Sequence, residues 1–332
     1  MQMPTTVTSS PEVEITPVSD RPPARELRNH SLDSTRWKGF PFREGDIVIA
    51  SWAKAGTTWT QQILGQLIFN AAADLPIIDM CPWVDQRYRP LQSVMDQLQA
   101  QTHRRFMKTH LPSDAIQLCP FARYIYVGRD GRDALWSWHN HHRHLTPHAL
   151  RLLNDTPGRV GPPLGPATDD LRQFFHDWLD RDGFPVWPFW SNVSSWWAVR
   201  ERPNVLLVHF NNLKRDLEGE MRRIARFLGI SVEESLWPRM LWHCSFEYMK
   251  QHGAQFSAML KRGFVNGADD FFYRGNNGRW RETLTADDVH KYHRCAAAEL
   301  SVECAHWLAT GEGLERTVTA SEVALDPNAT RT

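Results

Sequence analysis

The sequence predicts an α/β fold in which a central parallel β-sheet is flanked by helices. Short, nearly continuous apolar runs predict four strands buried on both faces, at 46–52, 105–110, 123–129 and 205–210. Helical patterns follow three of these strands, at 57–72, 132–142 and 213–229. Gly229 is placed to end the last of these helices. Strands that alternate with helices in this way are typical of a layered α/β arrangement.

The chain divides into one predicted domain and two weaker ends. Residues 1–30 are polar and Pro-rich without the apolar stretch of a signal peptide, so we expect a flexible arm. Residues 312–332 are also poor in core-forming side chains and predict a flexible tail. Between them, we expect residues 31–311 to form a single domain. Pro and Gly are dense in the stretch 145–186, which predicts an insertion or a mobile lid.

The composition limits the classes of partner. Lys plus Arg equals Asp plus Glu at 38 each, so no overall field attracts nucleic acid or an anionic membrane. No apolar run approaches the ~20 residues of a membrane-spanning helix. The five cysteines are scattered, which favours reduced thiols and a cytoplasmic location. The fifteen Trp indicate either core packing or an aromatic-walled pocket for an apolar ligand.

The turn between the first strand and its helix could bind a phosphate group. Ligands of open parallel sheets collect at the carboxyl ends of strands, where helix N-termini present N–H groups. Gly56 allows close approach of the backbone, Lys54 adds a charge, and Thr57 and Thr58 add hydroxyls. The loop lacks the Gly-Lys-Ser/Thr ending of nucleotide triphosphatases. A plain turn with a Thr cap is the alternative.

Three further segments carry candidate polar residues. Lys108 and His110 lie on the same side of the second strand at its end, where His110 could act as a general base. A lone surface histidine is the alternative. Arg129 ends the third strand, Ser137 lies two turns along the next helix, and "YRGNNGRW" (273–280) forms a loop able to close on an anion. Solvated ion pairs and an Asn-Gly turn are the alternatives here.

Taken together, the four segments resemble one enzyme family. Their order and spacing resemble those of the cytosolic-type sulfotransferases across about residues 35–310; the segments are "AKAGTTW", "KTHLP", "YVGRDGRDALWS" and "YRGNNGRW". The donor of that family is 3′-phosphoadenosine 5′-phosphosulfate (PAPS), and PAP is its product. The resemblance implies a P-loop nucleotide-kinase-like three-layer architecture and a PAPS-dependent sulfotransferase that uses no metal.

The resemblance also implies the binding residues. The 5′-phosphate and sulfonate would be held by Lys54, Gly56, Thr57 and Thr58. Adenine would contact Trp59, Ser245 and Phe246, and the 3′-phosphate would contact Arg129, Ser137, Arg274 and Gly275. His110 would be the general base, while Lys54 and Lys108 stabilise charge. The chain departs from the family pattern at Ala53, Ala55, Cys244, Tyr273 and His290. The change at His290 puts the dimer contact of animal members in doubt.

The sequence leaves several alternatives open. One is an ATP-dependent phosphotransferase on a similar scaffold, against which the missing Gly-Lys-Ser/Thr argues. Another is a non-catalytic binding protein, against which the presence of both Lys108 and His110 argues. A metal site at His139–His144 lacks a carboxylate at suitable spacing. We expect the acceptor to be a small apolar or aromatic molecule bearing a hydroxyl or amine, with a sugar hydroxyl as the alternative. The oligomeric state is not predicted.

Overall fold

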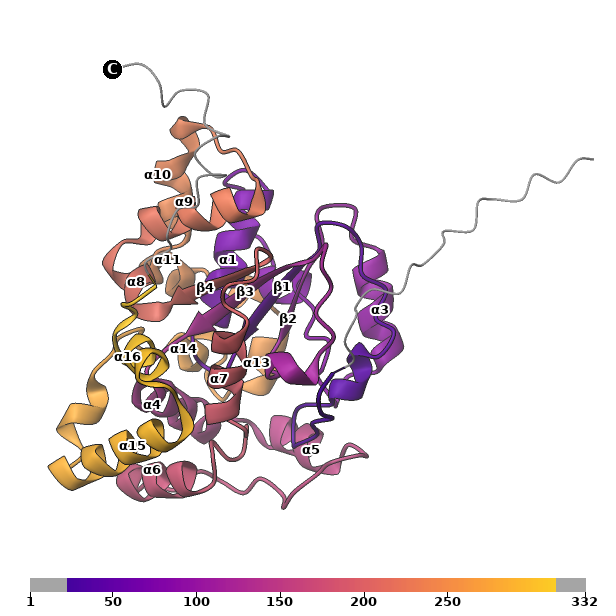
Figure 1. Ribbon diagram of the computed structural model, residues 1–332. Coiled ribbons are helices and arrows are strands. Elements are labelled where there is room, and N and C mark those ends of the chain that lie inside the picture. Colours follow the sequence, from indigo (N-terminus) through magenta and orange to yellow (C-terminus); the bar gives the residue numbers. More distant parts are fainter. Residues whose placement is uncertain (1–22, 315–332) are drawn as a thin grey trace, which may run out of the picture.

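A parallel sheet of four strands forms the centre of the computed structural model, which describes residues 23–314 (Figure 1). The strands are β1 (Ile47–Ser51), β2 (Phe106–Thr109), β3 (Arg123–Gly128) and β4 (Val205–His209). Their order in the sheet is β2-β1-β3-β4, and every neighbouring pair is parallel. All four predicted strands are confirmed.

Helices account for most of the remaining described chain. The longer ones are α1 (Thr57–Ile68), α3 (Leu91–Gln99), α4 (Gly131–Arg143), α5 (Pro147–Asp155), α6 (Leu171–Asp180), α7 (Trp190–Ala198), α9 (Leu217–Leu228), α15 (Ala286–Glu299) and α16 (Val302–Thr310). The shorter ones are α2 (Ile77–Met80), α8 (Phe210–Arg215), α10 (Trp237–His243), α11 (Phe246–Gln251), α12 (Gly253–Phe256), α13 (Met259–Gly263) and α14 (Ala268–Phe271). Single turns of 3₁₀ helix are η1 (Ser34–Trp37), η2 (Ser113–Ala115), η3 (Glu234–Leu236) and η4 (Arg279–Glu282).

The sheet lies between two helical layers because its strands are apolar on both faces. Val48 and Ala50 of β1 join a core shared with α7, α15 and α16. Ile47 and Ile49 point the other way, into a core shared with α1, α9 and α10. Burying each large aliphatic side chain stabilises the fold by about 1.5–3 kcal/mol. The predicted three-layer α/β architecture is confirmed. Gly229 also ends α9 in the left-handed conformation, as predicted.

Strand register brings the ends of three strands together. Ala50 lies beside Thr109, and Ser51 lies beside Val127. The residues that follow β1, β2 and β3 therefore emerge at one edge of the sheet. Helices α1 and α4 begin at this edge, so their N-termini face the same space. Parallel sheets with this arrangement bind ligands at that edge.

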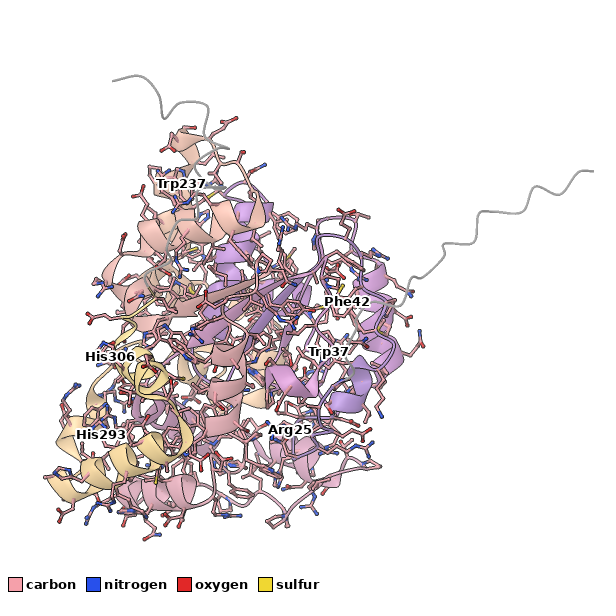
Figure 2. All side chains as sticks on the ribbon, viewed as in Figure 1. Arg25, Trp37, Phe42, Trp237, His293 and His306 are labelled. Atoms are coloured by element: carbon pink, nitrogen blue, oxygen red, sulfur yellow. The ribbon has the colours of Figure 1, made fainter. Side chains whose placement is uncertain are left out.

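Of the predicted arm and tail, the structure describes residues 23–30 and 312–314. Residues 1–22 and 315–332 lie outside the described residues. Of the predicted arm, residues 23–30 are packed: Arg25, labelled in Figure 2, donates to Asp114 at 3.1 Å and Ser191 at 2.9 Å. Asn29 and His30 are buried. The segment 145–186 contains α5 and α6, and its opening as a lid stays a prediction. Among residues 23–314, no helix is both long and apolar enough to cross a bilayer.

Candidate active site

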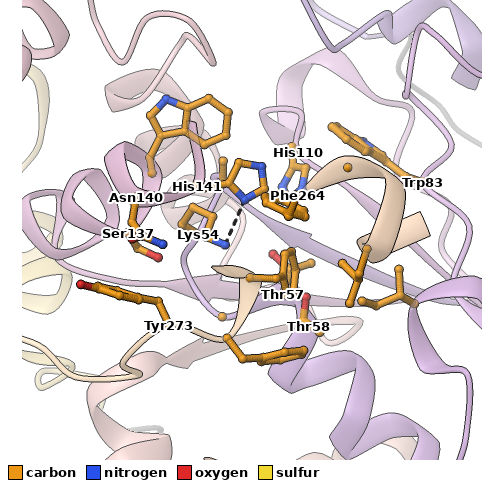
Figure 3. Close-up of a pocket in the computed structure, with 18 of the residues that line it drawn as sticks. Lys54, Thr57, Thr58, Trp83, His110, Ser137, Asn140, His141, Phe264 and Tyr273 are labelled. Atoms are coloured by element: carbon orange, nitrogen blue, oxygen red, sulfur yellow. Dashed lines mark hydrogen bonds between the residues drawn. The ribbon is translucent and has the colours of Figure 1, made fainter. Parts of the chain in front are cut away.

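A cavity of about 850 Å³ opens at the carboxyl ends of the strands (Figure 3). It is lined by side chains from every segment that the sequence motifs singled out. The predicted residues that line it are Lys54, Gly56, Thr57, Thr58, Trp59, Lys108, His110, Arg129, Ser137, Phe246, Arg274 and Gly275. Ser245 does not line it. The four motifs, separated by up to about two hundred residues of chain, therefore form one site.

The loop after β1 is shaped to expose its backbone. Gly56 has φ of 118°, and a Cβ there would lie only 3.1 Å from the ring of Phe210, so a larger residue would be both strained and crowded. Lys54 also has positive φ, at 65°. No side chain caps the start of α1. The Thr57 hydroxyl instead pairs with that of Ser51 at 2.6 Å. The N–H groups of the first turn of α1 are thus suited to bind an anion.

His110 is held in one orientation at the end of β2. Its Nδ1 lies 2.8 Å from the Ser51 carbonyl oxygen, which can only accept a hydrogen bond. Nδ1 therefore carries the proton, and Nε2 keeps its lone pair. Burial, followed by the charges of Lys108 and Lys54, lowers the pKa of His110 to about 3. The imidazole is neutral near pH 7, as a general base must be.

Asp85, an acid that no sequence motif indicated, accepts a hydrogen bond from the backbone of His110. Asp85 is fully buried and accepts from the indole N–H groups of Trp83 at 2.7 Å and Trp37 at 3.2 Å. It also accepts from the His110 backbone N–H at 3.3 Å. Burial raises the pKa of Asp85. Asp85 stands alone in the loop before α3, so no spacing pattern marked it; only the fold brings it to His110.

Arg129 bridges the loop after β1 and the loop before η4. It donates to the Asn277 side-chain oxygen at 2.7 and 3.0 Å and to the Lys54 carbonyl oxygen at 2.9 Å. Its guanidinium group lies over the Phe210 ring, 4.1 Å from the centroid. Burial lowers the pKa of Arg129 to about 10. Neighbouring Asp130 pairs with Arg132 at 2.6 Å, so it is not the partner of Arg129.

The remaining motif residues connect α1, α11 and the Gly-rich loop at another side of the cavity, which Trp59, Phe246 and Gly275 line. Gly275 has φ of 62°, and a Cβ there would come within 2.5 Å of the Phe246 ring. The indole N–H of Trp59 donates to the Cys244 carbonyl at 2.8 Å, which joins α1 to the start of α11. Ser245 caps α11 and accepts from the Tyr248 N–H at 3.1 Å. Its side chain is thus used in the helix cap, outside the cavity.

The cavity concentrates positive charge. Lys54, Lys108 and Arg129 converge on it, and among residues 23–314 none of them forms a salt bridge. Burial, then Arg129 and Lys108, lowers the pKa of Lys54 to about 7. Burial also lowers the pKa of Lys108. Desolvated cations that repel one another are costly unless an anion joins them, so the site is built for a multiply charged anion.

The other half of the cavity is apolar. Its walls come from α5, α13 and α14, with aromatic rings from the loop before α3 and from α4; they include Leu145, Leu152, Leu153, Met259, Phe264, Phe271, Trp83, Trp136 and Trp138. Segment 145–153 lies in the region predicted as an insertion or lid. Trp59, Trp83, Trp136 and Trp138 line this cavity, whereas most of the other tryptophans, such as Trp178, Trp196 and Trp307, pack in the core.

The histidine tract of α4 does not gather around a metal. The rings of His139 and His142 contact the carbonyl oxygens of Thr168 and Gly165, each at 2.8 Å. Only His141 of the tract's histidines lines the cavity. Within the described range 23–314, no three His, Cys, Asp or Glu side chains are grouped as metal ligands.

Comparison with known proteins assigns the family. The sulfotransferase domain model matches residues 44–302. The chain belongs to the sulfotransferase family. A glycolipid sulfotransferase of Mycobacterium bovis is 32% identical over 303 residues, covering 84% of this chain and 91% of that protein. Sulfotransferase 1 family member D1 of Mus musculus is 24% identical, covering 77% of this chain and 83% of that protein.

A solved structure shares the fold of this sulfotransferase. Retinol dehydratase, in complex with androsterone and the inactive cofactor PAP, superposes with a TM-score of 0.65 at 22% identity. The match covers 81% of this chain and 84% of that one. The likeness supports the three-layer architecture derived from the strands and cores.

Proposed function

We propose that this sulfotransferase moves the sulfonate group of PAPS to a hydroxyl or amine of a small acceptor, leaving PAP as product. The observation that carries the proposal is the convergence of three unpaired cations and an oriented His110 on one cavity. PAPS carries two phosphate groups and a sulfonate, a charge pattern that this cluster complements. The PAP complex of retinol dehydratase supports a nucleotide of this kind.

The donor would lie against the cationic half. Lys54, Gly56, Thr57 and Thr58, which line the cavity at the start of α1, would surround the phosphosulfate. Ser137, Arg274 and Gly275 would join Arg129 around the 3′-phosphate, and Trp59 and Phe246 would contact adenine. Ser245 would contribute through the cap of α11, which positions Phe246. No metal is needed in this scheme, because lysine, arginine and helix N–H groups supply the positive field.

The reaction would proceed by in-line displacement. The acceptor oxygen bonds to sulfur while the bond between sulfur and the phosphate oxygen breaks, and Nε2 of His110 takes the acceptor proton. Lys54 stabilises the charge that grows on the leaving phosphate oxygen, and Lys108 stabilises the sulfonate oxygens. Because Lys54 and Lys108 help to lower the pKa of His110, the negative charge of the bound donor would raise that pKa and strengthen the base.

The acceptor would be an apolar or amphiphilic molecule that bears the reacting hydroxyl. The apolar walls from α5, α13 and α14 support this class. The Mycobacterium bovis relative is named a glycolipid sulfotransferase, and retinol dehydratase was solved with androsterone. A sugar hydroxyl on a lipid would satisfy both the polar and the apolar part of the cavity. The cytoplasmic location stays a prediction.

Sulfonate transfer tests this proposal directly. Purified protein is incubated with PAPS labelled in the sulfonate group and a panel of phenols, sterols, glycolipids and free sugars, and products are identified by mass spectrometry. We expect transfer to apolar or amphiphilic alcohols and little to free sugars. Transfer to none of the panel, or phosphoryl transfer from ATP instead, would contradict the proposal.

A further inference from the structure

The amine of Lys54 has one hydrogen-bonding partner among the described side chains. Its Nζ lies 3.3 Å from Nδ1 of His141, the contact drawn as a dashed line in Figure 3. The residues beside Lys54 are Ala53 and Ala55, so its own loop offers no adjacent hydroxyl. The ring of Phe271 lies 4.5 Å from Nζ and contributes a cation–π contact. Lys54 is therefore held from α4 and α14, across the cavity.

His141 is itself fixed by aromatic packing. Its ring stacks on Trp138 at a centroid distance of 5.0 Å and meets the edge of Phe264 at 4.7 Å. Burial, then the charge of Lys54, lowers the pKa of His141 far below the usual range, so the imidazole is neutral. A neutral imidazole has one donor nitrogen and one acceptor nitrogen. Since Lys54 approaches Nδ1 as an ammonium donor, Nδ1 accepts and Nε2 carries the proton.

The other groups that face Lys54 do not favour its charged form. Arg129, from the end of β3, and Lys108, from β2, lower its pKa by repulsion. His110 is neutral and bonded to Ser51. On α14, Asp270 accepts from the Asn266 N–H at 2.7 Å and its side chain at 3.1 Å. His141 is thus the neighbour that accepts a hydrogen bond from the ammonium group.

We propose that His141 is the positioning residue for Lys54: its Nδ1 accepts a hydrogen bond that orients the amine over the loop and favours the protonated state. The consequence rests on the proposed function, in which Lys54 must be charged when the leaving oxygen departs. Hydrogen bonding to the charged form of a group favours that form. Loss of the acceptor nitrogen therefore lowers the pKa of Lys54. As the pH rises, the protonated and active fraction of the enzyme is then lost at a lower pH than in the wild type.

Two substitutions separate hydrogen bonding from packing. His141→Phe keeps a ring against Trp138 and Phe264 but removes the acceptor, whereas His141→Gln keeps an acceptor and removes the ring. His142→Gln, next along α4 and outside the cavity lining, is the matched control. Folding is checked by circular dichroism; if His141→Phe does not fold, His141→Leu replaces it.

The first readout needs no catalysis. Reductive methylation of Lys54, followed by peptide mass spectrometry across a range of pH, reports the fraction of neutral amine. We expect the midpoint in His141→Phe to fall by about one pH unit, the scale of a lost hydrogen bond to a charged group. His141→Gln should stay nearer wild type, and His142→Gln should match it. A midpoint unchanged in His141→Phe would overturn the proposal.

The second readout is the rate of sulfonate transfer as a function of pH, in particular the alkaline limb, where the rate falls as the pH rises. The limb should move to lower pH in His141→Phe and be largely restored in His141→Gln. Equal loss of rate in both variants without a shift in the limb would assign His141 to packing alone. If wild-type protein transfers no sulfonate, the proposed function fails, while the methylation midpoint still decides the role of His141.

Discussion

The two halves of the cavity are built by different means. The cationic half consists of residues that directly follow β1 and β3, Lys108 near the end of β2, and the Gly-rich loop that Arg129 binds. Its geometry is imposed by the backbone: Gly56 and Gly275 have positive φ and lie against aromatic rings. The apolar half is made of side chains from several separate helices. Among these, α5 and α13 pack against each other, and Leu145 and Phe264 form an isolated antiparallel β-bridge.

The different construction of the two halves determines where specificity can change. The cationic half depends on backbone conformation and on hydrogen bonds between segments, so most substitutions there would disturb donor binding. The apolar half depends on size and shape, and volume-conserving apolar substitutions usually cost little stability. We therefore expect one donor site joined to an acceptor site that tolerates change, except at Phe271 and Trp83, whose rings contact Lys54 and Lys108. His110 stands at the boundary between the halves.

The largest effect is expected at that boundary. His110→Ala removes the group that takes the acceptor proton, and general-base catalysis contributes roughly 10²–10⁴ in rate. We expect kcat to fall by about that factor for every acceptor, while PAP binding by calorimetry stays within a few-fold of wild type. Turnover close to wild type would show that His110 is not the base. Loss of PAP binding as well would mean that the two halves are not separable there.

The second effect is confined to the cationic half. Arg129→Lys keeps the charge but cannot reproduce two bonds to Asn277 together with one to Lys54. We expect Kd for PAP and KM for PAPS to rise roughly tenfold, the scale of one lost charge-assisted hydrogen bond. KM for the acceptor should change little.

Arg123→Lys is the matched control, because Arg123 lies at the opposite end of β3. A comparable rise in KM for both substrates in Arg129→Lys would contradict a donor-specific role.

The contrast between the halves also explains what the sequence could predict. Strands such as 123–129 were predicted because a strand buried on both faces is a continuous apolar run, and the loops after them carry local motifs. Asn277 and Asp85 were not predicted to support Arg129 and His110, since each acts through contacts between segments far apart in the chain. Ser245 matched a motif, yet its side chain is used in the cap of α11.

The aliphatic side chains of the apolar wall had no sequence signal for the same reason. Leu152 and Met259 lie on short helices about a hundred residues apart, and neither helix alone indicates a pocket. Pro and Gly between 145 and 186 predicted an insertion or a mobile lid, and the helices α5 and α6 within this stretch were not predicted. An amphipathic helix against a core and one against a ligand have the same pattern.

The smallest effect is expected at the rim of the apolar half, where two similar leucines can be compared. Leu152 on α5 is 38% exposed and lines the cavity, while Leu91 on α3 is 39% exposed and does not. Leu152→Asp places a charge beside the apolar acceptor and removes part of the contact that the leucine makes. A fully buried leucine contributes about 1.5–3 kcal/mol, so we expect the KM for the acceptor to rise roughly tenfold. KM for PAPS should not change.

Leu91→Asp introduces the same charge at a similar exposure, so it should leave both KM values near wild type. Stability is compared by thermal unfolding, because both positions are exposed and neither substitution should change Tm by much. If Leu152→Asp raised KM for PAPS instead, or if both variants behaved alike, the apolar wall would not be the acceptor site. A selective effect on apolar acceptors, absent for short polar alcohols, would establish that α5 contacts the acceptor tail and that the two halves act independently.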